Sequence, residues 1–271
     1  MSEHGLRADE IDTSRAHPAR MYDYYLGGKD NYEVDREAAE RVRAAMPNVM
    51  DAARVNRAFM HRAVRAVVGG GIRQIIDIGT GIPTAPNTHE IAQGIAPETR
   101  VAFVDNDPIV GVHANARLRG VGATGFALAD IRDPAAVLGH PVVKNLIDFD
   151  EPIALMLLAV LHFVKDDEDP WRIVATLRDA LPAGSVLVLS HVTGDVRVGL
   201  ADQDERLTEA VHAYDKATSP IALRPVPQIR AFFEGFEVEE PGVVTCAEWR
   251  PDPDTWNEAP IGFYGGVGRK L

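Results

Sequence analysis

Apolar residues in the first quarter of the chain recur at helical spacing. Within residues 33–46 they fall three or four positions apart, at Val34, Ala38, Val42 and Ala45. Pro47 follows, so this pattern predicts an amphipathic helix that ends there. A second helix is predicted from Asp51, a favourable N-cap residue, to the glycines at 69–71. Its apolar positions are Val55, Phe59, Ala63 and Val67.

After these glycines, short apolar runs alternate with helical stretches, which is typical of a parallel sheet covered by helices on both faces. Strands are predicted at residues 74–78, 101–104, 125–129, 153–160 and 185–190, with two more near 236–239 and 261–267. Helices are predicted at residues 171–181, 204–218 and 226–233, and another begins at the capping-box pair Asn87 and Glu90. We therefore expect an α/β fold: a Rossmann-like, doubly wound, seven-stranded and mostly parallel sheet with an antiparallel last strand and an N-terminal helical cap.

The same pattern divides the chain into three parts. Residues 1–17 are polar and charged without periodicity, and we expect a flexible N-terminus there. Residues 18–70 contain the two helices of the predicted cap or lid. Residues 71–271 form the sheet domain, which is expected to bind the ligand.

Composition narrows the range of partners. The 271 residues, 46% of them hydrophobic, are enough for a full core. Forty acidic against 28 basic residues give a net charge of −12, which disfavours nucleic acid and anionic membranes as partners. The longest apolar run, residues 153–160, is far shorter than the ~20 residues of a membrane span. Cys246 is the single cysteine, and no Cys/His cluster has metal-ligand spacing, so we expect a cytoplasmic protein without a bound metal.

The first predicted strand leads directly into a glycine turn, Asp77-Ile78-Gly79-Thr80-Gly81-Ile82-Pro83-Thr84. Gly79 and Gly81 permit a tight turn and the close approach of a ligand, because neither carries a Cβ atom. A dinucleotide fingerprint requires Gly or Ala near position 84, where this chain has Thr84. An acid before the first glycine would also repel a pyrophosphate. Asp77 therefore favours S-adenosylmethionine over NAD, whereas the glycines alone are equally consistent with a plain βα turn.

The next two strands also lead into acids. Asp105 ends the second strand at the carboxyl edge, beside the glycine turn, where a carboxylate can accept hydrogen bonds from both ribose hydroxyls. Asp130 follows the third strand, where it can accept from the adenine amino group, and Ile131 can pack on the ring. Three acids on one edge are hard to explain by solvation alone. Asp107, in contrast, fits better as a helix N-cap.

Three further segments complete a resemblance to a known family. They are residues 18–32 (PARMYDYYLGGKDNY), 56–59 (NRAF) and 264–269 (YGGVGR). With the glycine and aspartate motifs, they make the chain resemble class I S-adenosylmethionine-dependent methyltransferases. The tyrosine–glycine segment points to an actinobacterial subfamily of S-adenosyl methyltransferases formerly classed as a domain of unknown function. Pro83 replaces the third glycine of the commonest methyltransferase motif, as in this subfamily.

The resemblance implies a role for each motif. Gly79 and Gly81 would line the methionine part of the cofactor, Asp105 the ribose and Asp130 the adenine. The remaining expected cofactor contacts are Asp77, Thr80, Asn106, Ile131, Leu158 and Ala159.

The tyrosine-rich segment 22–32 has two interpretations. Its aromatic side chains and the paired glycines Gly27-Gly28 suit a hinged lid, but they equally suit an anchor that packs the cap onto the sheet. For a lid, the expected contacts with cofactor or substrate are Tyr22, Tyr25, Lys29, Asn31 and, from the second helix, Asn56.

The fourth strand ends where a transferred methyl group would lie. Amino-methylating enzymes of this fold often carry an Asn/Asp-Pro-Pro segment there, but this chain reads Leu157-Leu158-Ala159-Val160-Leu161-His162-Phe163. An oxygen or carbon acceptor is therefore favoured. His162 is the candidate general base, although a structural histidine is equally consistent with the pattern, and His191 is a second candidate.

These observations predict an S-adenosylmethionine-dependent methyltransferase acting on a small molecule. Two alternatives stay open: a protein that binds S-adenosylmethionine without transferring its methyl group, and a nicotinamide oxidoreductase. The acceptor, the pathway and the oligomeric state do not follow from the sequence.

Overall fold

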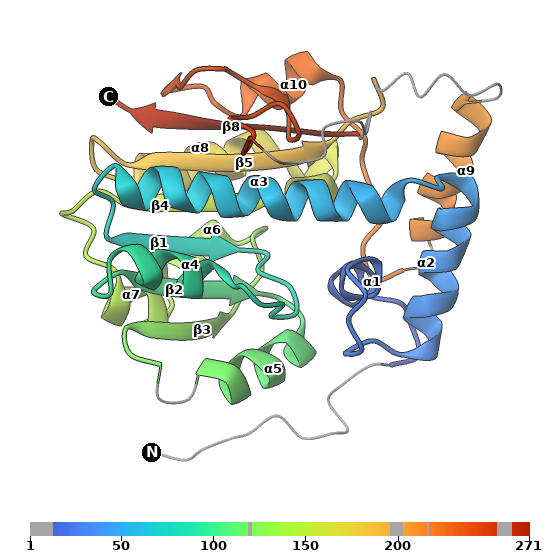
Figure 1. Ribbon diagram of the computed structural model, residues 1–271, viewed down its shortest axis with the longest axis horizontal. Coiled ribbons are helices and arrows are strands. Elements are labelled where there is room, and N and C mark those ends of the chain that lie inside the picture. The colour runs from blue at the N-terminus through green and yellow to red at the C-terminus, as the bar shows by residue number, and fades with distance from the viewer. Residues whose placement is uncertain (1–12, 119–120, 196–202, 216, 254–261) are drawn as a thin grey trace.

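A computed structural model describes residues 13–118, 121–195, 203–215, 217–253 and 262–271. Its centre is an eight-stranded sheet with the strand order β3-β2-β1-β4-β5-β8-β6, and β7 pairs with β8 (Figure 1). The parallel strands are β1 (Gln74–Ile78), β2 (Arg100–Asp105), β3 (Thr124–Leu128), β4 (Ala154–Leu158) and β5 (Val186–Val192). β8 (Phe263–Lys270) runs antiparallel to β5, β6 (Phe236–Val238) and β7 (Val244–Thr245).

The predicted doubly wound, mostly parallel sheet is confirmed. The strand that the sequence did not predict is β7, because a pair of residues is too short to show a periodic pattern. β4 ends at Leu158, earlier than the predicted residue 160, because Ala159 adopts a left-handed φ of 52°. The predicted strand 261–267 begins one residue outside the described chain and is observed from Phe263.

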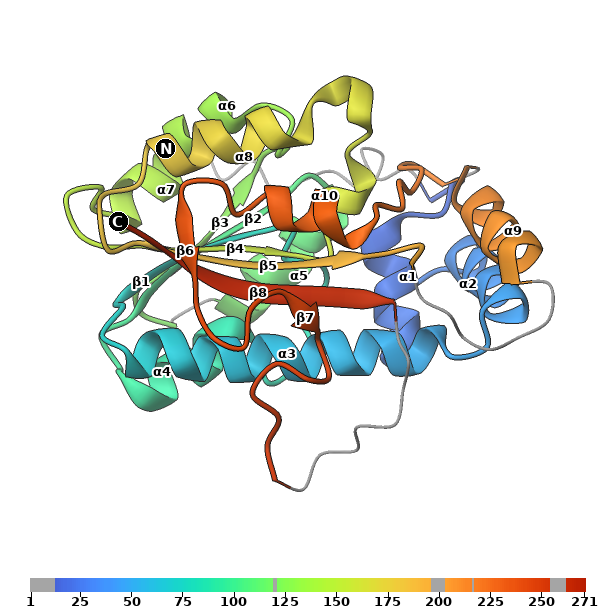
Figure 2. The ribbon, with the colours of Figure 1, turned by 90° about the horizontal axis from the view of Figure 1, so that it is seen from above.

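Helices cover both faces of the sheet, which explains why the central strands are buried along almost their whole length (Figure 2). One face packs against α3 (Val49–Gly69), α4 (Thr88–Ile95) and α5 (Pro108–Leu118). The other face packs against α6 (Pro134–Gly139), α7 (Pro141–Leu146), α8 (Pro170–Asp179) and α10 (Val226–Ala231). The sequence-predicted capping box at Asn87 and Glu90 starts α4, and Asp107 Oδ1 accepts from Ile109 N at the start of α5.

The cap stands beside the carboxyl ends of β1, β2 and β3 (Figure 1). It consists of α1 (Pro18–Tyr25), α2 (Glu33–Ala45), the first half of α3, and α9 (Gln203–Asp215), which returns from far along the chain to pack on α2. α1 lies in the segment that the sequence left open as lid or anchor. This helix was not predicted; in the structure the side chain of His17 caps it and Pro18 occupies its first turn.

α3 begins before the predicted N-cap. Val49 is its first residue and Asn48 precedes it, so the prediction that Asp51 caps the helix was wrong. Asp51 lies in the first turn and pairs with Arg54 instead, at 2.8 Å. The reason is tertiary, because Val49 and Met50 pack into the apolar core of the cap and are held in the helix.

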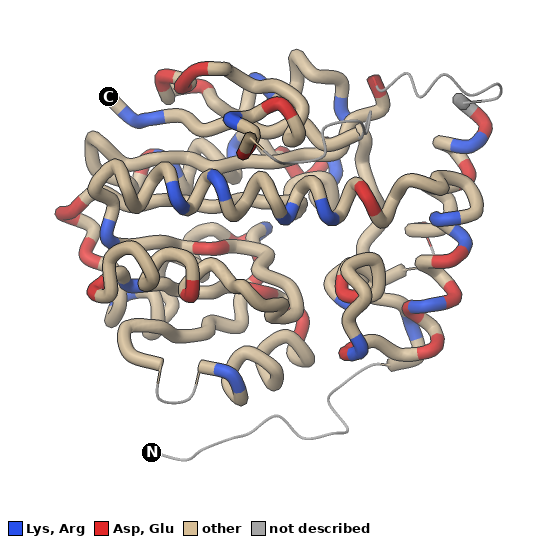
Figure 3. Tube along the Cα trace, viewed as in Figure 1, with Lys and Arg blue, Asp and Glu red and all other residues tan. Residues whose placement is uncertain are grey.

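The arginines of α3, blue along this helix in Figure 3, attach it to other segments. Arg57 donates to the carbonyl oxygens of Thr84 and Pro86 after β1. Arg62 is buried and donates to the carbonyl oxygens of Cys246 and Trp249, which lie before β8. α3 therefore links the cap, the glycine turn and the last part of the sheet.

Several predictions fall partly outside the described residues. Of the expected flexible N-terminus, residues 1–12 lie outside them, as does residue 216 of the predicted helix 204–218. None of the helices that the structure describes is both long and apolar enough to cross a membrane. Within the described ranges, no group of three or more His, Cys, Asp or Glu side chains is arranged to hold a metal ion.

Candidate functional site

A cavity of about 240 Å³ lies where the carboxyl edge of the sheet meets the cap. The structure brings fourteen of the sequence-predicted site residues to its wall: Tyr22, Tyr25, Asn56, Asp77, Gly79, Thr80, Gly81, Asp105, Asn106, Asp130, Ile131, Leu158, Ala159 and His162. Such a gathering requires the parallel register of the sheet, in which Asp77 on β1 lies beside Phe103 on β2 and Met156 on β4.

The glycine turn forms one end of the cavity. Gly79 and Gly81 have φ angles of 74° and 66°, in the left-handed region that favours glycine. A Cβ atom on Gly79 would come within 2.4 Å of Val160, whereas one on Gly81 would meet nothing within 4 Å. Gly81 therefore leaves open space beside its backbone, where a ligand can approach closely.

Asp105 is tied to this turn by hydrogen bonds. Its Oδ2 accepts from Gly81 N at 2.8 Å, and its Oδ1 accepts from Asp107 N at 2.9 Å. Burial raises the pKa of Asp105 to about 6, and the two backbone donors oppose this shift. An ionised carboxylate offers about four lone-pair sites, so Asp105 keeps the capacity to accept from a ligand.

Asp77, on β1, is buried. Its Oδ2 accepts from the Thr88 hydroxyl of α4 at 2.7 Å. Burial raises its pKa to about 6, while the Thr88 hydrogen bond and the charge of Arg57 act in the opposite direction. Burial also lowers the pKa of Arg57. A buried acid with a cationic side chain close enough to lower its pKa suits a zwitterionic ligand.

Asp130 is more exposed to solvent than Asp77 and Asp105. Its carboxylate accepts from Asn106 Nδ2 at 2.8 Å and from the backbone and guanidinium nitrogens of Arg132 at 2.9 to 3.2 Å. Partial burial raises the pKa of Asp130, but these hydrogen bonds and the Arg132 charge outweigh it and hold the pKa below its ordinary value. Asp130 is therefore the most firmly ionised of the three acids.

At the end of β4, a polar network crosses from the sheet to the cap. The backbone N–H of Ala159 donates to Ser190 Oγ at 3.0 Å, and this hydroxyl donates to Asn56 Oδ1 at 2.6 Å. Asn56 Nδ2 then donates to the Tyr22 hydroxyl at 2.9 Å. The left-handed backbone of Ala159 is thus held by a chain of buried partners, as is common at functional sites.

His162 lies on a short 3-10 helix, Leu161–Phe163, directly after this point. Its side chain is only 3% exposed, its Nδ1 has no hydrogen-bond partner among the described residues, and its ring centroid is 5.4 Å from that of His191. Burial holds the pKa of His162 well below 6.5, and the nearby His191 and Arg224 lower it further. The imidazole is therefore neutral at pH 7, and the burial and the Arg224 charge that lower its pKa make it a weak base.

Arg224 is a buried residue that sequence reasoning missed. Its guanidinium donates to the carbonyl oxygens of Leu161 and Val164, on either side of His162, at 3.0 and 2.7 Å. It also pairs with Asp166 at 2.6 Å and lies 2.9 Å from His191 Nε2. No motif marks this arginine in the sequence, because its partners lie in two segments, residues 161–166 and His191, that are far from it along the chain.

Lys29 and Asn31, two of the predicted lid contacts, do not line the cavity. Asn31 is buried and donates to Asp23 Oδ2 at 2.7 Å and to the Gly28 carbonyl, so it stabilises the turn after α1. Lys29 is exposed. Sequence reasoning missed other cavity residues, among them Arg57, Thr88, Ala210, Tyr214 and Phe263. Amphipathic spacing marks the buried face of α9, but not which cavity that face lines.

Comparison with known proteins agrees with this geometry. Residues 4–271 match the model of a family described as S-adenosyl methyltransferase. The chain is similar to a DUF574-family protein of Streptomyces avermitilis, with 41% identity and a TM-score of 0.89 over 96% of this chain and 100% of that one. It is also similar to a candidate methyltransferase of Thermobifida fusca, with 37% identity and a TM-score of 0.87 over 98% of each chain.

More distant similarity concerns the fold alone. The N-methyltransferase NodS of Bradyrhizobium japonicum, solved with S-adenosyl-L-homocysteine, has 13% identity and a TM-score of 0.50 over 93% of this chain and 98% of that one. A search of curated proteins found no significant match.

Proposed function

The chain belongs to the S-adenosyl methyltransferase family, and we propose that it methylates an oxygen or carbon atom of a small-molecule acceptor in the cavity between sheet and cap. The observation that carries this proposal is the Asp105 carboxylate, held 2.8 Å from the Gly81 nitrogen in the cavity wall. It combines a buried acceptor with an open glycine turn.

The residues present fit S-adenosylmethionine. Asp105 has unused acceptor capacity for a pair of ribose hydroxyls, and a methyl group placed on Gly81 would meet no protein atom within 4 Å, so there is room for a ligand beside it. Asp77 and Arg57 offer one acid and one cation for the two charges of the methionine part. Asp130 and Ile131, after β3, would hold the adenine amino group and ring.

When bound at this site, S-adenosylmethionine would supply the electrophilic methyl carbon for the transfer. The protein's own contribution is positioning, exclusion of water and, for a hydroxyl acceptor, removal of a proton. We assign the last role to His162, whose buried imidazole is neutral and lines the cavity. Arg224 would act as a positioning residue, because it holds the backbone on both sides of His162.

Isothermal titration of the full chain tests the proposal. S-adenosylmethionine is expected to bind with micromolar affinity and NAD not at all. Asp105→Ala should weaken the binding of S-adenosylmethionine at least tenfold, because it removes an ionised hydrogen-bond acceptor. Asp133→Ala is the matched control, since Asp133 only caps α6 outside the cavity. Equal affinity of the Asp105 and Asp133 variants, or binding of NAD alone, would contradict the assignment.

A further inference from the structure

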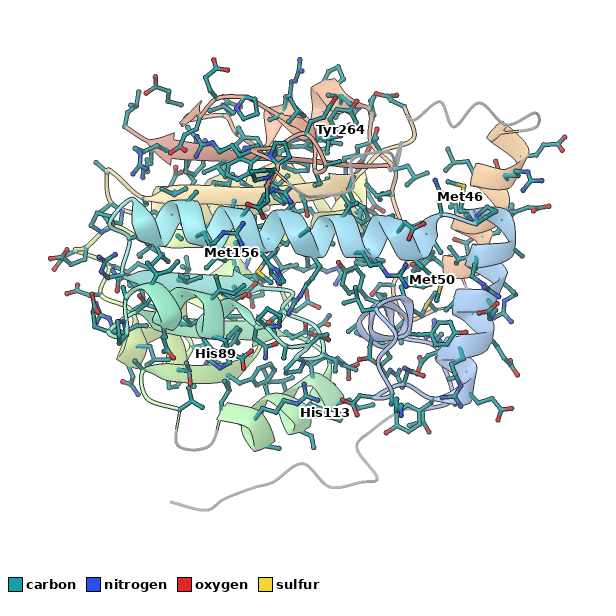
Figure 4. All side chains as sticks on the ribbon, in the orientation of Figure 1. Met46, Met50, His89, His113, Met156 and Tyr264 are labelled. Atoms are coloured by element: carbon teal, nitrogen blue, oxygen red, sulfur yellow. The ribbon has the colours of Figure 1, made fainter. Side chains whose placement is uncertain are left out.

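One part of the cavity is formed by the cap rather than by the glycine turn. The apolar core of the cap and the cavity wall share a set of residues, which we call the apolar lobe; its principal members are Tyr25, Val42, Met46, Ala53, Ala210 and Tyr214. They come from α1, α2 and its C-cap, α3 and α9. Met46, labelled in Figure 4, lies between α2 and α3, at the C-cap of α2.

Short side chains explain why there is open space here. Most of the buried residues in the core of the cap are alanines, including Ala38, Ala53, Ala210 and Ala213. Helices that pack through alanines approach closely but leave little side-chain volume to fill the gaps at their ends. The lobe therefore has apolar walls that an apolar ligand can complete.

The charged side chains of the cavity lie at its other end. Asp77 lies in β1, Asp105 ends β2 and Asp130 follows β3, while Arg57 and Arg132 bond to the loops there. No Lys or Glu lines the cavity within the described chain. A charged acceptor in the lobe would lose its hydration without gaining a partner of opposite charge, which is costly.

The lobe does offer a polar contact of a particular kind. The hydroxyls of Tyr25 and Tyr214 lie 3.4 Å apart and have no other hydrogen-bond partner among the described residues. Each hydroxyl can donate one hydrogen bond and accept two, so the pair retains capacity for a ligand. Burial raises the pKa of Tyr214 to about 12, and it raises that of Tyr25 well above its ordinary value, so both stay neutral donors.

We propose that the apolar lobe is the acceptor site and takes an uncharged, hydrophobic ring compound carrying a hydroxyl or carbonyl oxygen, which the Tyr25–Tyr214 pair recognises. This inference rests on the proposed function and adds the class of acceptor to it. The neutral hydroxyl pair favours an oxygen on an apolar ring. The arginines and aspartates of the cavity lie at its other end, so a carboxylate or an ammonium group in the lobe would have no partner of opposite charge.

The test uses the full chain saturated with S-adenosylhomocysteine, which carries no methyl group to transfer. Three probes of one shape are titrated by calorimetry: 2-naphthol, naphthalene and 2-naphthoate. We expect 2-naphthol to bind, naphthalene to bind several-fold more weakly, and 2-naphthoate to bind at least tenfold more weakly than 2-naphthol. Tight binding of 2-naphthoate would overturn the inference, because it would require a cation in the lobe.

Two conservative variants test the hydroxyl pair. Tyr25→Phe and Tyr214→Phe should each weaken 2-naphthol about three- to tenfold, the value of one hydrogen bond, and leave naphthalene unchanged. Tyr24→Phe is the matched control, because Tyr24 lies on the same helix, bonds to Glu40 and does not line the cavity. An unchanged affinity of both variants for 2-naphthol would refute the role of the pair.

The outcomes separate this inference from the function on which it rests. If S-adenosylhomocysteine itself does not bind, the proposed function fails. If it binds and all three naphthalenes fail to bind, only the acceptor class is wrong. Thermal unfolding of each variant with S-adenosylhomocysteine confirms that a lost probe affinity does not reflect a lost fold.

Discussion

Ser190 on β5 donates a 2.6 Å hydrogen bond to the side-chain oxygen of Asn56 on α3. Neither group is exposed, and each has a further partner: Ser190 accepts from the backbone of Ala159, and Asn56 donates to Tyr22. One side chain of α3 thus connects α1 to the end of β4, where the backbone is left-handed. The geometry at the end of β4 consequently depends on the cap being in place.

Loss of this connection should destabilise the protein. Asn56→Ala would remove the acceptor of the Ser190 hydroxyl and the amide donor to the Tyr22 hydroxyl, while Ser190 keeps the Ala159 N–H and Tyr22 keeps the Ala53 carbonyl, at a cost of about 1 to 3 kcal/mol. We expect the midpoint of thermal unfolding to fall by roughly 5 °C or more. Asn145→Ala, in an exposed position of α7, is the control. Equal midpoints for the two variants would show that the network contributes nothing.

The two glycines of the turn should respond differently to alanine. Gly79→Ala combines a left-handed backbone with a 2.4 Å approach to Val160, so it should lower the unfolding midpoint strongly. Gly81→Ala has the backbone strain alone, of order 1 kcal/mol, but its methyl group would project into open space. Thermal unfolding and titration with S-adenosylmethionine measure both effects. Gly81→Ala should lose affinity out of proportion to its loss of stability, and the reverse pattern would contradict the placement of the cofactor beside Gly81.

Asp77 should reduce the stability of the ligand-free protein at neutral pH. Its folded-state pKa of about 6 exceeds the ordinary value of 3.8, so the folded state holds more protons between these values. As the pH rises from about 4 to 6, the folded protein loses this proton, and the free energy of unfolding therefore falls by about 2 to 3 kcal/mol. Asp77→Asn keeps an acceptor for Thr88 and should raise the unfolding midpoint at pH 7.5 but not at pH 4. The same variant should bind S-adenosylmethionine more weakly, and a lower midpoint at pH 7.5 would disprove the expected cost of the buried charge.

His191 should remain neutral over the physiological range. Burial lowers its pKa to about 3, the hydrogen bond with the Val192 carbonyl opposes this, and the Arg224 charge adds to it. Only the tautomer with hydrogen on Nδ1 can donate to Val192 O and accept from Arg224 at Nε2. Nitrogen-15 spectra of the imidazoles should show this tautomer from pH 5 to 8.

The same pKa determines a pH effect on stability. Below pH 6.5 the unfolded chain binds a proton at His191 and the folded chain does not. The contribution of His191 to the free energy of unfolding is therefore complete above pH 6.5 and is lost as the pH falls toward 3. His191→Gln should reduce this acid sensitivity in urea unfolding. An imidazolium signal assigned to His191 at pH 6 in the folded protein would contradict the burial argument.

Much of the sheet follows from local pattern. Apolar runs predicted β1 to its observed bounds and β2, β3 and β5 to within two residues at each end, because each of these strands carries a short apolar run bounded by polar or turn residues. Asp77, Asp105 and the glycines were recognisable because parallel strands bring the residues that follow them to one edge. In each case the information lies within a few residues of the feature itself.

Other features depend on residues that are far apart in sequence. The position of α9 against α2 creates the apolar lobe, yet nothing within residues 203–215 indicates which helix they will meet. Arg224 holds the segment around His162 across some sixty residues of chain, and Asn56 reaches Ser190 over a separation of 134. Lys29 and Asn31 share a sequence segment with Tyr25 but lie outside the cavity, because the turn after α1 directs them away.

By itself, then, the sequence determined the doubly wound sheet and the acidic, glycine-lined edge at which a cofactor is expected, since both arise from periodicity and from chemistry next to strand ends. The tertiary structure alone decided where the cap closes, which side chains complete the cavity and how the histidines are held neutral. Those properties depend on packing and burial between distant segments, and burial, unlike residue type, exists only once the chain has folded.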